Sequence, residues 1–109
     1  MKKTKSISQL ELKELIEKGQ KVLIIDVRSQ EEYEKQHIPN ALNITIEQLE
    51  KGELNLDKDT LIVTVCGKGG GRSENASNFI RNNYNQDVHF LDGGTFRWFD
   101  EILDKKIIK

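Results

Sequence analysis

Several classes of protein are excluded by what this 109-residue sequence has little of. It contains one cysteine, so no disulfide can form within the chain, and we expect a reducing compartment, the cytoplasm. The 17 basic and 18 acidic residues leave a net charge of −1, and without a basic excess we expect no nucleic-acid partner. No apolar run approaches the ~20 residues that span a bilayer, and no apolar stretch follows the basic start MKKTKSIS, so we expect neither a membrane partner nor a secretory signal.

Internal repeats and low-complexity segments are also absent, and the length fits one domain over residues 1–109. Two apolar runs, Val22–Val27 and Leu61–Val65, predict strands buried on both faces, and Ala41–Ile44 and Val88–Leu91 predict shorter ones. Helical patterns separate these strands. The sequence therefore predicts an α/β fold, with a central, mostly parallel sheet of about five strands and helices on both faces.

Three helix starts carry the capping-box signature, a Ser or Thr with Glu or Gln three residues later. The pairs are Ser8 with Glu11, Ser29 with Glu32, and Thr45 with Gln48. Gly19 is expected to end the first helix, because glycine readily takes the left-handed conformation at that position.

The stretch LIVTVCGKGGGRS, residues 61–73, carries the most chemistry. A predicted strand leads directly into Cys66, and a helix is expected to begin near Ser73. Glycine-rich backbone between a strand and a helix can direct several N–H groups inward, and the helix N-terminus adds partial positive charge. We therefore expect Cys66 to be a nucleophile with a lowered pKa. The anion-binding loop is expected to consist of Gly67, Lys68, Gly69, Gly70, Gly71 and Arg72.

Supporting residues are expected on either side of this loop. Asp26 lies near the carboxyl end of its predicted strand, the edge where open parallel sheets bind ligands, and so near Cys66. Asp26 and Arg28 are expected either to tune the loop or to form structural ion pairs, with Glu32 as a partner for Arg28. Ser73 is the third supporting residue.

Metal binding is not expected, because Cys66, His37 and His89 supply no CxxC motif and no close pair of ligands. His89 falls within the last predicted strand and is expected to be a packed or edge residue. Trp98 and its Phe neighbours are expected to belong to the core, with one of them available to cover the loop.

Two further motifs flank the cysteine loop. Residues 25–44 read IDVRSQEEYEKQHIPNALNI, with Asp-x-Arg, an acidic–aromatic pair and His-Ile-x-x-Ala-x-Asn, and residues 91–98 read LDGGTFRW, with a Gly-Gly pair and a following Trp. With the cysteine loop between them, the chain resembles a single-domain member of the rhodanese-like family from about Ser8 to Phe99.

The resemblance implies a sulfurtransferase that needs no cofactor. Cys66 would take a sulfane sulfur from a donor such as thiosulfate, become a persulfide and pass the outer sulfur to an acceptor. The loop from Gly67 to Arg72 would hold the anionic donor and the persulfide, and His37 would be a structural hinge. The implied partners are a small anionic sulfur donor and a thiol or cyanide-like acceptor, with a protein acceptor also open.

Two departures from the family pattern stand out. Asn40 replaces the usual glycine, which should only adjust a turn. Five residues, Gly67 to Gly71, separate Cys66 from Arg72, where common single-domain rhodaneses have four. Five is the spacing of related cell-cycle phosphatases and arsenate reductases, so a phosphatase or arsenate reductase using Cys66 is one alternative. Against it, Val65 stands where those phosphatases have histidine, and the loop holds no acid for a leaving group. A non-catalytic binding module is the other alternative.

Loop length yields the first prediction. Deleting one of Gly69, Gly70 or Gly71 should raise thiosulfate use and weaken phosphate or arsenate binding, because the shortened loop brings its N–H groups closer to the oxygens of thiosulfate. Both quantities are measured on the deletion variant and on the parent. If both fall together, or neither changes, loop length does not select the anion.

Overall fold

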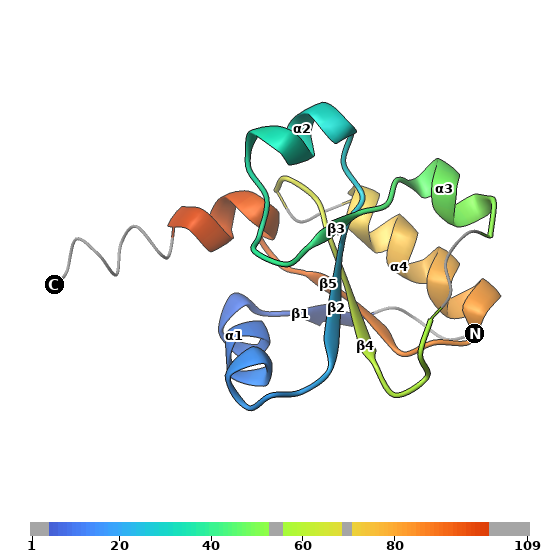
Figure 1. Cartoon of the computed structure of the whole chain (residues 1–109), viewed down its shortest axis with the longest axis horizontal. Helices are drawn as coiled ribbons and strands as arrows, with labels where there is room; N and C mark the ends of the chain where they lie inside the picture. The colour runs from blue at the N-terminus through green and yellow to red at the C-terminus, as the bar shows by residue number, and fades with distance from the viewer. Residues whose placement is uncertain (1–4, 53–55, 69–70, 101–109) are drawn as a thin grey trace, which may run out of the picture.

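The computed structural model describes residues 5–52, 56–68 and 71–100. Within these residues the chain forms five strands and five helical segments in an α/β arrangement (Figure 1). The elements are β1 (Lys5–Ile7), α1 (Gln9–Glu17), β2 (Val22–Asp26), α2 (Gln30–Lys35), β3 (Leu42–Asn43), α3 (Ile46–Glu50), β4 (Leu61–Val65), α4 (Gly71–Tyr84), β5 (Val88–Leu91) and a helical segment at 94–100.

The strands form one sheet in the order β1-β5-β4-β2-β3, and all four neighbouring pairs are parallel. β2 and β4 lie at its centre, in a register that places Asp26 opposite Val65. The residues that follow these two strands therefore emerge at the same edge of the sheet, as expected for Asp26 and Cys66. Ligands of open parallel sheets gather at this carboxyl edge.

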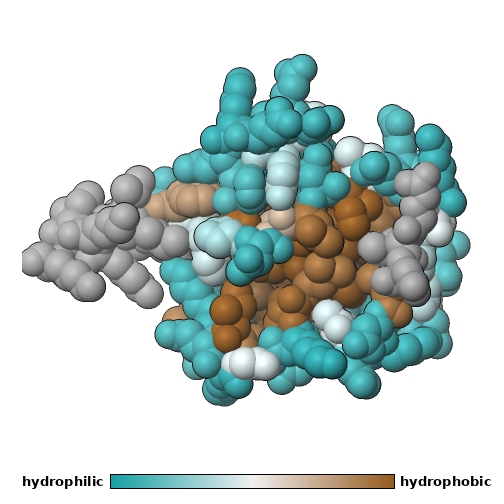
Figure 2. All heavy atoms as spheres, viewed as in Figure 1, coloured by the Kyte–Doolittle hydropathy of each residue, from teal (hydrophilic) through white to brown (hydrophobic). Residues whose placement is uncertain are grey.

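Helices cover both faces of the sheet, as predicted. Figure 1 shows α1 and the helical segment at 94–100 on one side, α3 and α4 on the other, and α2 beyond the carboxyl ends of the strands. Two buried clusters fill these layers, one including Leu12, Val63 and Trp98, the other Ile62, Leu49 and Ile80. Figure 2 shows apolar side chains gathered over the strands in this view, with hydrophilic ones on the surrounding helices. None of the described helices is long and apolar enough to cross a membrane.

The local helix signals are confirmed. All three capping boxes form, at the starts of α1, α2 and α3. At the end of α1, Gly19 has a φ of 77° and its N–H donates to the Ile16 carbonyl, while the Gln20 N–H donates to the Leu15 carbonyl. These two bonds make a Schellman motif, which satisfies carbonyls that the helix leaves open.

Two elements, β1 and α4, differ most from the sequence-based expectation, and β2 and β3 are slightly shorter than predicted. β1 was not predicted, since a three-residue strand is too short to show an alternating pattern, and it is held by parallel pairing with β5. α4 begins at Gly71 rather than near Ser73, which places Arg72 in its first turn. The N–H groups of a helix's first turn have no intrahelical acceptor, and the apolar pattern of the sequence does not mark where that turn begins.

Asn40, which stands where the family usually has glycine, has a φ of 70°. It lies in the turn closed by the Ala41 N–H, which donates to the Ile38 carbonyl at 3.0 Å. Asparagine enters this left-handed region more readily than other residues with a side chain, which explains why the replacement is tolerated.

A second prediction concerns this turn. Asn40→Ala should lower the free energy of unfolding by about 1 kcal/mol, because alanine pays the full steric cost of the left-handed conformation. Asn40→Gly should unfold within a few tenths of a kcal/mol of the parent, since glycine takes this φ freely. Urea unfolding of the three proteins measures both differences. An alanine variant as stable as the glycine variant would contradict this account.

Candidate active site

Cys66 follows β4 directly and is anchored on both sides by hydrogen bonds. Its carbonyl accepts from the Thr95 N–H at 2.8 Å, and its thiol donates to Ser73 Oγ at 3.3 Å. The Thr64 hydroxyl donates to the Ser73 carbonyl at 2.8 Å, which ties the end of β4 to the start of α4. Only 4% of Cys66 is exposed. The thiol is therefore a positioned group, with a hydroxyl close enough to donate to it once it is ionised.

An open pocket lies at this carboxyl edge of the sheet. The described residues that line it are Glu32, Cys66, Gly67, Lys68, Gly71, Arg72 and Phe96. Gly69 and Gly70, also assigned to the anion loop, lie outside the described residues. The structure thus brings Cys66 together with both cations expected from the sequence, Lys68 and Arg72.

Phe96 covers the first residue of the loop. A Cβ added at Gly67 would lie 3.1 Å from Phe96 Cε2, and the Phe96 N–H donates to the Gly67 carbonyl at 3.1 Å. The three aromatic side chains of this segment separate: Trp98 is buried in the core, Phe99 packs against the same cluster, and Phe96 remains 45% exposed. One aromatic residue therefore packs the core while another borders the site, as the sequence suggested.

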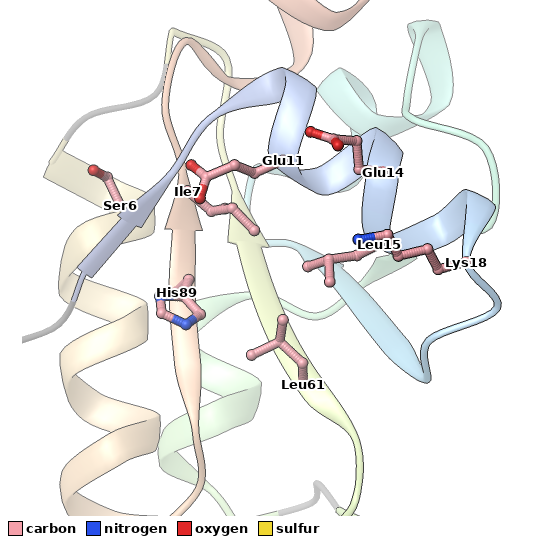
Figure 3. Close-up of a pocket in the computed structure, with 8 residues that line it drawn as sticks. All are labelled: Ser6, Ile7, Glu11, Glu14, Leu15, Lys18, Leu61 and His89. Carbon is pink, nitrogen blue, oxygen red and sulfur yellow. The ribbon is translucent and has the colours of Figure 1, made fainter.

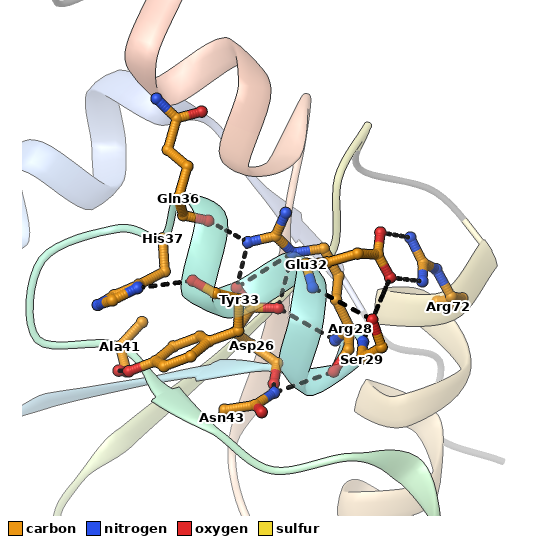
Figure 4. A network of polar contacts seen from close by, with 10 residues as sticks. All are labelled: Asp26, Arg28, Ser29, Glu32, Tyr33, Gln36, His37, Ala41, Asn43 and Arg72. Atoms are coloured by element: carbon orange, nitrogen blue, oxygen red, sulfur yellow. Dashed lines mark hydrogen bonds and ion pairs between the residues drawn. The ribbon is translucent and has the colours of Figure 1, made fainter.

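Asp26 and Arg28 form a buried ion pair beneath α2 (Figure 4). The Arg28 guanidinium donates to both Asp26 carboxylate oxygens, at 2.8 to 3.2 Å, and Nη2 also donates to the Gln36 carbonyl at 2.6 Å. The prediction of an ion pair is confirmed, but Glu32 was the wrong partner for Arg28. Asp26 reaches the guanidinium first, because the chain turns sharply after β2 and the Arg28 N–H also donates to Asp26 Oδ1.

Glu32 pairs instead with Arg72, 40 residues later in the chain. Arg72 Nη1 lies 3.0 Å from Glu32 Oε1, and Nη2 lies 3.3 Å from Oε2, a bidentate contact. This hydrogen bonding lowers the pKa of Glu32 to about 2 and raises the pKa of Arg72. Both groups are therefore charged at every pH near neutrality.

The two histidines are placed apart from Cys66. His37 stacks on Tyr33 with ring centroids 3.9 Å apart, and its Nδ1 lies 2.9 Å from the Tyr33 carbonyl oxygen. These contacts suit a structural residue. His89 lies on β5 and lines a separate pocket beside α1, which Glu11 also lines (Figure 3). Neither histidine is among the described residues that line the Cys66 pocket.

Sequence reasoning missed Glu32 as a residue of the site. It was assigned to the capping box and, wrongly, to a pair with Arg28; the capping role is present, with the Ser29 N–H donating to Glu32 Oε1 at 3.3 Å. The available signal was weak: the box places this side chain at the start of a helix beyond the carboxyl edge of the sheet. Its contact with Arg72 depends on the tertiary arrangement of α2 and α4.

Comparison with known proteins gives one consistent result. The model of the Rhodanese-like domain family matches residues 8–101. The chain is 33% identical over 94 residues to "Thiosulfate sulfurtransferase GlpE" of Coxiella burnetii, covering 86% of each chain, and 34% identical over 101 residues to "Putative sulfurtransferase YtwF" of Bacillus subtilis, covering 93% of this chain and 96% of that one. The crystal structure of a rhodanese-like domain protein from Staphylococcus aureus superposes with a TM-score of 0.77 at 32% identity, over 87% of this chain and 91% of the other.

A third prediction tests the Glu32–Arg72 pair through stability. Glu32→Gln removes the charge but keeps a side chain suited to the capping box. At pH 7 the free energy of unfolding should therefore fall by less than about 1 kcal/mol. Because folding lowers the pKa of Glu32 from 4.5 to about 2, this contribution is complete above about 4.5 and declines as the pH falls toward about 2.

Thermal unfolding of parent and variant between pH 7 and pH 3 measures the difference. The two melting temperatures should converge on acidification. A gap that widens as the pH falls would show that Glu32 is not stabilised as the anion.

Proposed function

Since the chain belongs to the rhodanese-like domain family, whose curated relatives include sulfurtransferases, we propose that it moves a sulfane sulfur from a donor such as thiosulfate to a thiophilic acceptor through a persulfide on Cys66. The observation that carries the proposal is the position of Cys66, which directly follows the central strand β4 and lines a pocket together with Lys68 and Arg72.

The reaction has two displacements at sulfur. The Cys66 thiolate attacks the terminal sulfur of thiosulfate, a new S–S bond forms, and the S–S bond of the donor breaks as sulfite leaves with the electron pair. An acceptor thiolate or cyanide then attacks the outer sulfur of the persulfide and releases the Cys66 thiolate. The sulfur atom is transferred and the Cys66 thiolate is regenerated without a cofactor, so a single reactive cysteine is sufficient.

The residues around Cys66 have distinct roles in this scheme. The Ser73 hydroxyl, 3.3 Å from Sγ, donates to the thiolate and favours the ionised form. The first turn of α4 adds partial positive charge. Lys68 and Arg72 stabilise the anionic donor and the negative charge of the persulfide. The Asp26–Arg28 ion pair stabilises the carboxyl edge of the sheet, where these residues lie.

The competing hypothesis, a phosphatase or arsenate reductase, is supported by the five-residue spacing between Cys66 and Arg72. It needs a group that protonates the leaving oxygen. Glu32 is the carboxylate among the described residues that line the pocket, and with a pKa of about 2 it is a poor proton donor at neutral pH. This favours sulfur transfer over phosphate chemistry.

An intact-mass measurement tests the proposal. After incubation with thiosulfate and removal of small molecules, the parent should gain the mass of one sulfur atom, and cyanide should then remove it as thiocyanate. Cys66→Ser should gain no mass, because a serine hydroxyl cannot form a persulfide. Its melting temperature should stay close to that of the parent.

A separate sample treated with an aryl phosphate provides the comparison. If the aryl phosphate releases its phenol and no sample gains sulfur from thiosulfate, the phosphatase alternative replaces the proposal. The absence of both reactions would leave the non-catalytic binding module.

A further inference from the structure

The cation expected to bind the donor is already engaged by an anion of the same chain. Arg72 directs both terminal nitrogens of its guanidinium at the two oxygens of Glu32, at 3.0 and 3.3 Å. The carboxylate is also held from its own helix, because the N–H and the hydroxyl of Ser29 donate to Oε1 at 3.3 and 3.1 Å. Glu32 is therefore fixed from two sides, and Figure 4 shows it between Ser29 and Arg72.

This carboxylate contributes to the pocket as well as to the ion pair. The charged side chains among the described lining residues are Glu32, Lys68 and Arg72, which together carry one net positive charge. A donor that enters this pocket meets a fixed negative charge. The energetic cost of that encounter rises with the donor's own negative charge, because Coulomb energy is proportional to the product of the charges.

We propose that Glu32 selects the sulfur donor by charge: it offsets one of the two cations of the pocket and so weakens binding of the thiosulfate dianion more than binding of donors with at most one negative charge, such as thiosulfonates and alkyl persulfides. This inference rests on the proposed sulfur transfer through Cys66 and identifies its donor class. Glu32 is a specificity residue, since it lines the pocket and also occupies the guanidinium that a dianion would otherwise use.

The chemistry at Cys66 is the same for the favoured donors. With an alkyl thiosulfonate, the Cys66 thiolate attacks the terminal sulfur, the S–S bond breaks, and an alkanesulfinate leaves with the electron pair. With an alkyl persulfide in its protonated form, attack on the outer sulfur releases the alkyl thiolate, and the proton remains on the transferred sulfur. Both steps give the same Cys66 persulfide, so a change of donor changes binding and leaves the product of the half-reaction unaltered.

Thiosulfate and ethanethiosulfonate make a matched pair of probes. Each carries the transferred sulfur on a sulfonyl centre, and they differ by one negative charge. Initial rates of thiocyanate formation are measured for both donors at low ionic strength, with cyanide as the common acceptor, to obtain kcat and KM for each donor separately.

Three variants isolate the charge of Glu32. Glu32→Gln removes it and retains the capping role of the side chain, and Glu32→Asp retains it. Glu31→Gln is the matched control, because Glu31 lies on the same helix, is exposed, and is not a lining residue of this pocket. It changes the net charge of the protein by the same amount.

Glu32→Gln should lower KM for thiosulfate about tenfold and KM for ethanethiosulfonate about threefold, with kcat little changed. These values correspond to one unit charge about 6 Å from the donor in a water-like dielectric. The preference for the monoanion should thus fall about threefold. Added salt should reduce the effect, Glu32→Asp should remain near the parent, and Glu31→Gln should change either KM by less than about twofold.

Two results would overturn the inference while leaving sulfur transfer in place: equal changes in KM for both donors, or a loss of kcat for both, which would make Glu32 a structural support of the loop. The proposed function fails separately, if the parent forms no Cys66-dependent persulfide from either donor.

Discussion

A buried charge that must be paired organises the carboxyl edge of this sheet. Arg28 is 2% exposed and Asp26 is fully buried, and an unpaired ion at such a position costs several kcal/mol. Two elements supply partners for Arg28. Its guanidinium donates to the Asp26 carboxylate at the end of β2 and to the Gln36 carbonyl just after α2. The Asn43 amide completes the cluster by donating to the carbonyls of Asp26 and Arg28. This fixes α2 and β3 against the end of β2.

The position of α2 then determines the environment of Cys66. With its far end held by Arg28, α2 presents Glu32 in its first turn to the first turn of α4, where Arg72 lies. The opposite side of the pocket is set by the last helical segment, through Thr95 on the Cys66 carbonyl and Phe96 on the Gly67 carbonyl. Cys66 is thus surrounded by three segments that are distant in sequence, and a buried ion pair aligns one of them.

The sequence was sufficient for features set by local geometry and insufficient for those set by packing. The capping boxes follow from contacts three residues apart, and β4 follows from an uninterrupted apolar run, so both were predicted correctly. The partner of Glu32 could not be derived, because α2 and α4 meet only when the sheet has formed. Asp26 and Arg28 were correctly marked as paired charges, yet choosing between Asp26 and Glu32 required the path of the chain after β2. Likewise, the apolar pattern of residues 94–100 does not reveal that Trp98 faces the core and Phe96 the site.

The two unusual features of the site act in the same direction. An intramolecular carboxylate occupies the guanidinium of Arg72, and the five-residue spacing is expected to place backbone N–H groups around a wider space, so in the proposed reaction the oxygens of thiosulfate would lose donors of both kinds. Cys66 lines this pocket, so the terminal sulfur of a donor that enters it would meet the thiol. In the proposed reaction, recognition would therefore shift from the oxygens of the donor to its transferable sulfur and to the group that leaves with the electron pair. A pocket of this kind would discriminate mainly by charge and by the leaving group, and the Phe96 side chain beside Gly67 offers an apolar surface against which an alkyl leaving group would pack.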